Sequence, residues 1–305
     1  MAEKTAVLAL LVAAFIWAMA GVSYKLFLAA GFTLAIIFWV SRLFKLLAVL
    51  GIAYYKKIPH MGIESVKDLK FVVLNALFSL GTPLFFVLAL EQTTLPNVYF
   101  LNYTMPAWVF IFAAFFLGEK INAKKIFAVL LTLLGIFFIA SPESIFSVNP
   151  GIIFGVLSAL SFSGDIITSR ELKDYRFHTV SIYSNALQLL AFSVIVLAFF
   201  PESFAVAATL PLDWLAALAF AGALLGYASD LYYYALEKIE ASAAAMVSLS
   251  ELFFASALAL LIFGTKPLLN ELAGYALILV SVSIFILRKS DIEYFEYLLH
   301  FRKRH

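Results

Sequence analysis

Apolar residues run along the chain in ten long stretches, separated by short polar loops. A helix that crosses a membrane needs about 20 mostly apolar residues, and in lipid it must satisfy its backbone hydrogen bonds internally. All ten stretches meet this length. We predict spans at residues 5–28, 33–55, 69–90, 95–117, 122–140, 150–170, 177–200, 212–236, 241–263 and 269–288. The pattern predicts an all-α membrane protein, with no room in the loops for a soluble domain.

The composition agrees with a chain that faces lipid. Of 305 residues, 64% are hydrophobic and 13% are charged, whereas a soluble domain has roughly 45–50% and 25%. Too few charges are available to cover a soluble surface of this size. The first stretch is long enough to span, and it lacks the short core and the cleavage site of a signal peptide, so we expect it to be retained as a helix.

Lysine and arginine gather in alternate loops, which predicts the orientation. Loops rich in these residues stay in the cytoplasm. With the N-terminus inside, the cytoplasmic loops hold the basic clusters at 56–70, 120–125 and 170–176, and the outside loops hold only Lys266. We predict a multi-pass protein of the plasma membrane with both termini cytoplasmic. The basic tail, 291–305, would either lie as a helix on anionic headgroups or stay solvated.

The second half of the chain repeats landmarks of the first half. The Ala-Leu-Glu of 89–91 recurs at 235–237, and the Gly-x-Lys of 118–120 recurs at 264–266 with the same spacing. Each half would contain five spans. Because five is odd, the second half must enter the membrane in the opposite sense, which makes the two halves inverted repeats.

The predicted organisation is a first five-helix repeat at 1–145, a second at 146–290, and the tail at 291–305. Inverted repeats are typical of secondary transporters, whose binding site lies between the repeats near the middle of the membrane. Exchanging the conformations of the two repeats opens such a site to either side. The sequence therefore indicates alternating access.

Charged residues inside the predicted spans are functional candidates, because each costs about 2.5–3.5 kcal/mol to insert. Lys25 lies near a membrane face, where its long side chain can reach the interface. Arg42, Lys45 and Glu251 are candidates for charge pairing or ion coupling. Opposite charges at one site would suit a zwitterion, but the same residues could pair with each other and fix the helices.

Three acids carry separate hypotheses. Asp165 shares a helix face with several serines, which either line a cavity or permit close helix packing. Asp230 is predicted to share a face with Tyr227 and Tyr234 and could hold a cation there, or lie wetted at a helix end. Glu251 lies near the middle of its span, where it would either exchange a proton or form an ion pair with a basic residue.

Aromatic and amide side chains complete the predicted binding site. They offer a cavity apolar contact together with hydrogen-bonding groups. With 16% aromatic residues, many rings must also simply face lipid. The candidate substrate-binding residues are Trp17, Tyr24, Tyr99, Asn102, Tyr103, Asp165, Tyr227, Asp230 and Glu251. Pro83 and Pro106 are expected to kink or hinge their helices.

The order and spacing of several short motifs resemble the drug/metabolite transporter superfamily, in its ten-helix EamA-type branch. The motifs are Ile16-Trp17-Ala18, Phe38-Trp39 with Arg42, Leu117-Gly118-Glu119, Leu160-Ser161-Phe162, Tyr234-Ala235-Leu236 and Leu249-Ser250-Glu251. The chain departs from the pattern at Leu252, where members often have proline, and at Thr265, where they often have glutamate. The resemblance implies a central cavity, peripheral fifth and tenth helices, and export or exchange of amino acids and related metabolites.

Other function classes fit less well. The four histidines, His60, His178, His300 and His305, are expected in loops or the tail, and no hydrolase or phosphate-binding motif occurs, so we expect no enzyme, no cofactor and no metal. A net charge of +2 argues against nucleic acid. The expected partners are a small-molecule substrate and the bilayer, with a homodimer left open. A flippase for lipids or lipid-linked sugars is the closest alternative.

Overall fold

The computed structural model describes residues 2–58, 62–63, 65–140, 150–209 and 211–286. The predicted boundary between the halves, at 145 and 146, and the predicted tail at 291–305 lie outside the described residues. The helices are α1 (Ala2–Ala29), α2 (Leu34–Tyr55), α3 (Val66–Leu90), α4 (Leu95–Asn102), α5 (Met105–Phe116), α6 (Ala123–Ala140), α7 (Pro150–Glu171), α8 (Phe177–Phe199), α9 (Glu202–Ala208), α10 (Leu212–Lys238), α11 (Ala241–Ser248), α12 (Ser250–Phe263) and α13 (Leu269–Ile286).

The ten predicted spans are confirmed, each within a few residues. In the described part of the chain, nine helical segments are long and apolar enough to cross a membrane, and the tenth, Leu269–Phe285, is a shorter apolar helix. The short helix α9 was not predicted. It lies in the loop between α8 and α10 and begins directly after Pro201, which cannot continue a helix from the residues before it.

The fourth and the ninth spans are each broken in the middle. α4 ends at Asn102 and α5 begins at Met105, with Pro106 in its first turn, a position that tolerates the missing proline N–H. α11 ends at Ser248 and α12 begins at Ser250, although no proline lies nearby. Pro83, by contrast, stays inside α3, which runs without interruption. Pro106 therefore lies at an interruption of its span, whereas the expected kink or hinge at Pro83 stays a prediction.

The two broken spans end in the same way. Gly118 and Gly264 both adopt the left-handed conformation, with φ of 66° and 68°, which glycine adopts without steric cost. The next residue in each case donates a hydrogen bond six positions back: Glu119 N to Ala113 O at 3.1 Å, and Thr265 N to Ala259 O at 3.4 Å. This helix-ending motif recurs in equivalent places of two inverted five-helix repeats.

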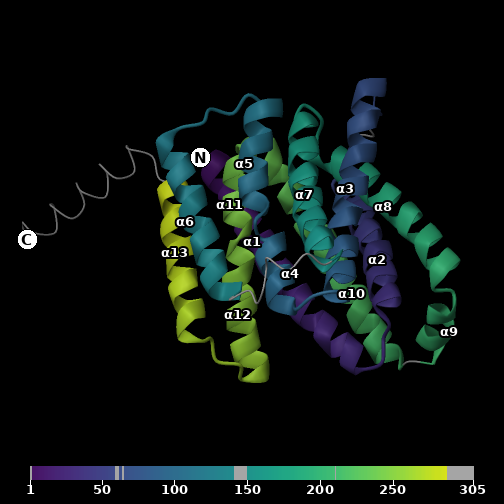
Figure 1. Cartoon of the computed structure of the whole chain (residues 1–305). Helices are drawn as coiled ribbons and strands as arrows, with labels where there is room; N and C mark the ends of the chain where they lie inside the picture. The colour runs from purple at the N-terminus through teal and green to yellow at the C-terminus, as the bar shows by residue number, and fades with distance from the viewer. Residues whose placement is uncertain (1, 59–61, 64, 141–149, 210, 287–305) are drawn as a thin grey trace, which may run out of the picture.

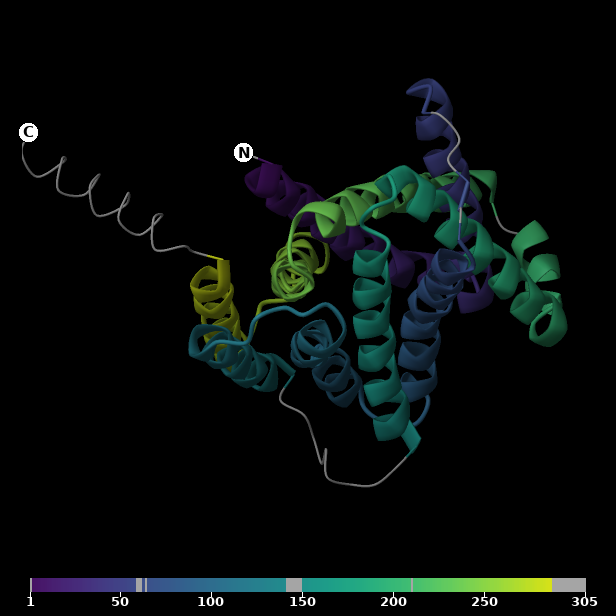
Figure 2. The ribbon, with the colours of Figure 1, turned by 90° about the horizontal axis from the view of Figure 1, so that it is seen from above.

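Helices from the two halves pack crosswise. α3 of the first half lies along α7 of the second, and α1 lies along α10 (Figure 1). Viewed from above, α6 and α13 lie side by side at one edge of the bundle, and α8 and α9 lie at the other (Figure 2). The largest buried apolar cluster draws residues from α1, α5, α7, α10 and α11. The centre of the bundle is thus built by both repeats.

α6 and α13 approach so closely that their backbones touch. A Cβ added to Gly135 would lie 2.8 Å from the carbonyl oxygen of Gly274, and one added to Gly274 would lie 2.5 Å from that of Gly135. Further along, Ser281 Oγ donates to the carbonyl oxygen of Ala128 at 2.6 Å. Small residues permit such contacts between membrane helices. The fifth and tenth spans therefore form a tightly packed pair.

Candidate functional site

A buried polar network lies where α3 of the first half meets α7, α8 and α10 of the second. Its centre is Asn75, on α3, whose side chain is fully buried. The Asn75 amide nitrogen lies 2.6 Å from Asp165 Oδ1 and 2.8 Å from Ser169 Oγ, both on α7. Its amide oxygen accepts hydrogen bonds from Ser184 on α8 at 2.6 Å and from Tyr233 on α10 at 2.9 Å. One side chain thus links four helices.

Asp165 is the acid of this network. It is only 6% exposed, and its second oxygen, Oδ2, accepts a hydrogen bond from the Tyr232 hydroxyl at 2.9 Å. Both carboxylate oxygens are therefore bonded by neutral donors, as burial of a polar group requires. Of the serines predicted to share its helix face, Ser169 joins the network, whereas Ser158 bonds to Asn102 at 2.8 Å.

Lys45, on α2, supplies the positive charge nearest this site. Its ammonium group interacts electrostatically with both Asp165 and Asp230. α2 packs closely on α10, because Gly226 leaves room for the Lys45 backbone: a Cβ there would lie 2.5 Å from the Lys45 carbonyl oxygen. Two acids and one base from three spans therefore share the interior.

Asp230 is paired with a histidine that the sequence analysis misplaced. His178 was expected in a loop, and this prediction was wrong: it lies in the first turn of α8, is buried, and its Nδ1 lies 2.8 Å from Asp230 Oδ2. The other oxygen, Asp230 Oδ1, is buried without a hydrogen-bond partner among the described residues. In that part of the chain, no group of three or more His, Asp or Glu could hold a metal.

Arg42 lies apart from the acids. Its guanidinium packs over the rings of Phe38 and Phe192, at 5.4 and 4.8 Å from their centroids, and it donates to the Phe38 carbonyl oxygen at 3.3 Å. Aromatic faces attract such a cation when water is excluded. Neither Arg42 nor Lys45 forms an ion pair with Glu251 in the described residues.

Glu251 lies in the first turn of α12, directly after the break in the ninth span. Its carboxyl group interacts electrostatically with Tyr99 and Tyr103 of the fourth span. These two rings stack on each other, with centroids 5.9 Å apart. The structure therefore brings Glu251, Tyr99 and Tyr103 together at the two helix breaks. They form a second polar site beside the network of Asp165.

The remaining predicted substrate-binding residues lie around these two polar sites. Trp17 packs edge-on against Tyr232 at 5.4 Å, which puts it beside the Asp165 network, and Tyr24 packs against Phe38 at 5.6 Å, nearer Arg42. Tyr227 is 47% exposed and forms no hydrogen bond with Asp230 within the described ranges. Tyr227 and Asp230 are thus not brought together as a pair.

A small pocket leads toward the network from the ends of α7, α8 and α10. Its lining includes Ser169 and Tyr233, which also belong to the network, and Lys173, Tyr175 and Glu237. Because Ser169 bonds to Asn75 and Tyr233 bonds to Asn75, the pocket reaches the polar side chains that hold Asp165. It lies on the side of the bundle where the positive charges of the loops predict the cytoplasm.

Five of the interior residues described above are not among the candidates that the sequence indicates: Asn75, His178, Ser184, Tyr232 and Tyr233. Asn75 is an amide inside an otherwise apolar span, which is a usable signal, because polar groups inside membranes are expensive. Residues with hydroxyl groups, such as Ser184 and Tyr233, are common in membrane helices. Nothing in the sequence therefore distinguishes these two from the many other serines and tyrosines.

Comparison with known proteins agrees with this architecture. One solved crystal structure superposes with a TM-score of 0.74 at 14% sequence identity, covering 93% of this chain and 96% of that chain. A protein of Archaeoglobus fulgidus described as an uncharacterized transporter is 26% identical over 210 residues, which are 68% of this chain and 73% of the relative. The uncharacterized transporter YoaV of Bacillus subtilis is 27% identical over 186 residues, 58% of this chain and 61% of that protein.

A match to a protein family identifies the family of this chain. The EamA-like transporter family matches the chain twice, at residues 4–141 and 149–287, so each half is matched by the same family unit. Together the two matches cover nearly all of the membrane-spanning helices described above. The chain is a multi-pass membrane protein and belongs to the EamA-like transporter family.

Proposed function

We propose that this protein is a secondary transporter that exports or exchanges a small zwitterionic or cationic metabolite, such as an amino acid or a related amine, by alternating access. The observation that carries the proposal is the Asp165 network. It places a buried carboxylate where α3 of the first repeat meets α7, α8 and α10 of the second. Substrate sites of inverted-repeat transporters lie at such a junction.

The charges around Asp165 support a substrate that carries an amine. A cationic group entering beside Asp165 would add an ion pair to a carboxylate whose described hydrogen-bond donors, Asn75 and Tyr232, are neutral. Lys45 interacts with the same carboxylate and could receive the carboxylate of a zwitterion. Trp17, packed on Tyr232, offers apolar contact beside them.

A ligand screen on the purified protein tests this proposal. Amino acids, amines, nucleosides and organic cations would be compared by thermal shift, since a ligand at about 100 times its Kd stabilises the folded state by about 2.7 kcal/mol. The best ligand would then be tested for counterflow in liposomes of defined lipid. A flippase for lipids or lipid-linked sugars is the alternative, and transport of lipid without counterflow of any soluble ligand would favour it.

The orientation proposed for the plasma membrane is that both termini lie in the cytoplasm. The chain contains no cysteine, so single cysteines can report the two faces directly. We expect an impermeant thiol reagent added outside intact cells to label Ser147→Cys and to leave Lys124→Cys unlabelled until the membrane is opened. The reverse pattern would invert the topology.

Glu251 is proposed to take part in the transport cycle and not only in structure. Because Glu251 has two tyrosines beside it and forms no ion pair with any basic residue that the structure describes, Glu251→Gln removes a charge without stranding a buried cation. We expect normal thermal stability and a loss of pH-dependent accumulation in liposomes, with exchange retained. Unaltered accumulation at every pH would assign Glu251 to the packing of the helix breaks.

A further inference from the structure

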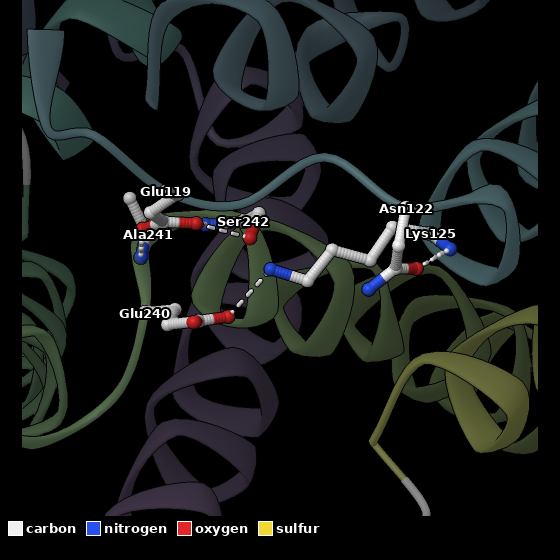
Figure 3. A network of polar contacts seen from close by, with 6 residues as sticks. All are labelled: Glu119, Asn122, Lys125, Glu240, Ala241 and Ser242. Carbon is white, nitrogen blue, oxygen red and sulfur yellow. Dashed lines mark hydrogen bonds and ion pairs between the residues drawn. The ribbon is translucent and has the colours of Figure 1, made fainter. Parts of the chain in front are cut away.

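Glu119 holds the start of α11 from the other half of the chain. It follows the end of α5, and its Oε1 accepts a hydrogen bond from the backbone N–H of Ala241 at 2.6 Å. Its Oε2 accepts bonds from the N–H of Ser242, at 3.4 Å, and from the Ser242 hydroxyl. Figure 3 shows the carboxylate placed over the first turn of α11. One side chain thus ties the two repeats together at this end.

The chemistry of this contact makes it strong. The first N–H groups of a helix have no partner inside the helix, and the helix dipole favours a negative charge there. α11 has no side-chain cap of its own at Glu240. Glu240 instead pairs with Lys125 at 2.7 Å, more toward solvent, with its side chain 52% exposed. Glu119 therefore supplies the cap of α11 from outside the helix.

Among the described residues, no equivalent contact occurs at the opposite end of the bundle. Thr265 follows α12 as Glu119 follows α5, and α4 begins as α11 begins. The loop after α5 and the loop after α12 lie at opposite ends of the molecule (Figure 1). Thr265 carries no charge, α4 has no side-chain cap at Thr94, and Pro96 has no N–H to donate. Two inverted halves that are otherwise alike differ in this contact.

We propose that Glu119 is a gate latch: its carboxylate, bonded to the first turn of α11, holds the two repeats closed at one membrane face, whereas the described residues provide no matching carboxylate at the other face. The proposal rests on the alternating access proposed above. Opening this face requires the start of α11 to leave the end of α5, and these helices pack together there. Each opening must then break the charged hydrogen bonds of Glu119. The latch therefore biases the protein toward closure at this face.

Two buried residues at equivalent positions of the two repeats can report the opening of the two membrane faces. Ala244 lies three residues after Ala241 in α11, and Val98 lies at the same place in α4; both are fully buried. Single cysteines there, Ala244→Cys and Val98→Cys, become reactive only when the respective helix moves away. Labelling rates of each reporter with a thiol reagent would be measured on the purified protein, so no knowledge of the substrate is needed.

The latch predicts opposite changes at the two reporters. With Glu119→Gln, labelling of Ala244→Cys should rise about tenfold, because a hydrogen bond to a charged group contributes about 1.5 kcal/mol or more. Labelling of Val98→Cys should fall, since opening one face closes the other. The control Glu240→Gln breaks the other contact that joins the repeats at this end, the ion pair with Lys125. Because the Glu240 carboxylate is half exposed, this ion pair contributes little, and neither labelling rate should change more than about twofold.

The outcomes separate the latch from the proposed function. An unchanged Ala244→Cys rate in Glu119→Gln, or an equal rise in Glu240→Gln, would overturn the latch whether or not the protein transports anything. A rise at Ala244→Cys with no fall at Val98→Cys would support the latch and contradict alternating access. A second variant, Thr265→Glu, adds a carboxylate at the position of the second repeat that is equivalent to Glu119. It should slow labelling of Val98→Cys, and an unchanged rate would count against capping as the means of closure.

Discussion

Asp165→Asn is expected to weaken substrate binding about 10- to 100-fold and leave the protein folded. The substitution keeps the shape of the side chain. Its oxygen can still accept from Asn75, and its new amide group can donate to the Tyr232 hydroxyl oxygen, so the network loses little. A substrate amine, however, loses a charged acceptor, and hydrogen bonds to charged groups contribute about 1.5–3 kcal/mol. The readout is the thermal shift produced by the best ligand, together with counterflow in liposomes.

The control for this prediction is Asp213→Asn, which removes a carboxylate at the exposed start of α10, far along that helix from Tyr232, the residue that bonds to Asp165. Its binding and transport should match those of the unaltered protein. If Asp165→Asn binds the same ligand with unchanged affinity, the carboxylate is not part of the substrate path, and its role is to pack α7 against α3 and α10.

Asn75→Leu is expected to lower the thermal midpoint by about 5–10 °C. Leucine fills a similar volume but removes the side chain that bonds to three other helices, α7, α8 and α10. Ser184 and Tyr233 lose their shared acceptor, and Asp165 loses its shortest hydrogen bond. Each buried polar group left unpaired costs about 1–3 kcal/mol, and the sum exceeds the gain from an added apolar side chain. Thermal unfolding of the purified variant in detergent would measure the loss.

Gln188→Leu provides the matched control. Gln188 is also a buried amide at the edge of this network, but within the described residues its side chain forms one hydrogen bond, from Nε2 to Ser184 Oγ at 3.1 Å. It should lower the midpoint by no more than about 3 °C. Equal losses in the two variants would show that Asn75 is no more than one polar group among several, and that the network has no centre.

The spans could be predicted because lipid leaves a membrane helix few alternatives. A stretch such as Leu212–Lys238 has to be helical throughout, and its length and apolar composition are visible in the sequence. Only one of the two helix breaks, in the fourth and ninth spans, is marked by a residue in the sequence. Pro106 marks the first, whereas Leu249 lies at a break with no proline or glycine beside it. The second break depends on packing between helices, which a local pattern does not report.

The sequence indicates which charged residues belong to the site, but it does not indicate how they are arranged. Burying a charge is costly anywhere in the membrane, so Asp165, Asp230 and Lys45 were visible as candidates, and the structure brings all three into one interior. Which partner each one takes depends on the crossing of α3 with α7 and of α2 with α10. His178 was missed for this reason: it is a helix-end residue in the sequence and becomes a buried partner of Asp230 only after α8 packs against α10.

The close pairing of α6 and α13 bears on how such a chain could have arisen. Ser281 stands in α13 where Gly135 stands in α6, and Ala128 stands in α6 where Gly274 stands in α13; both cross-pairs touch. A contact in which two partners present the same surface to each other is the geometry of a symmetric dimer. Two separate five-helix chains inserted in opposite directions would meet through this surface. The present chain has the form of a duplicated and fused ancestor that kept its dimer contact.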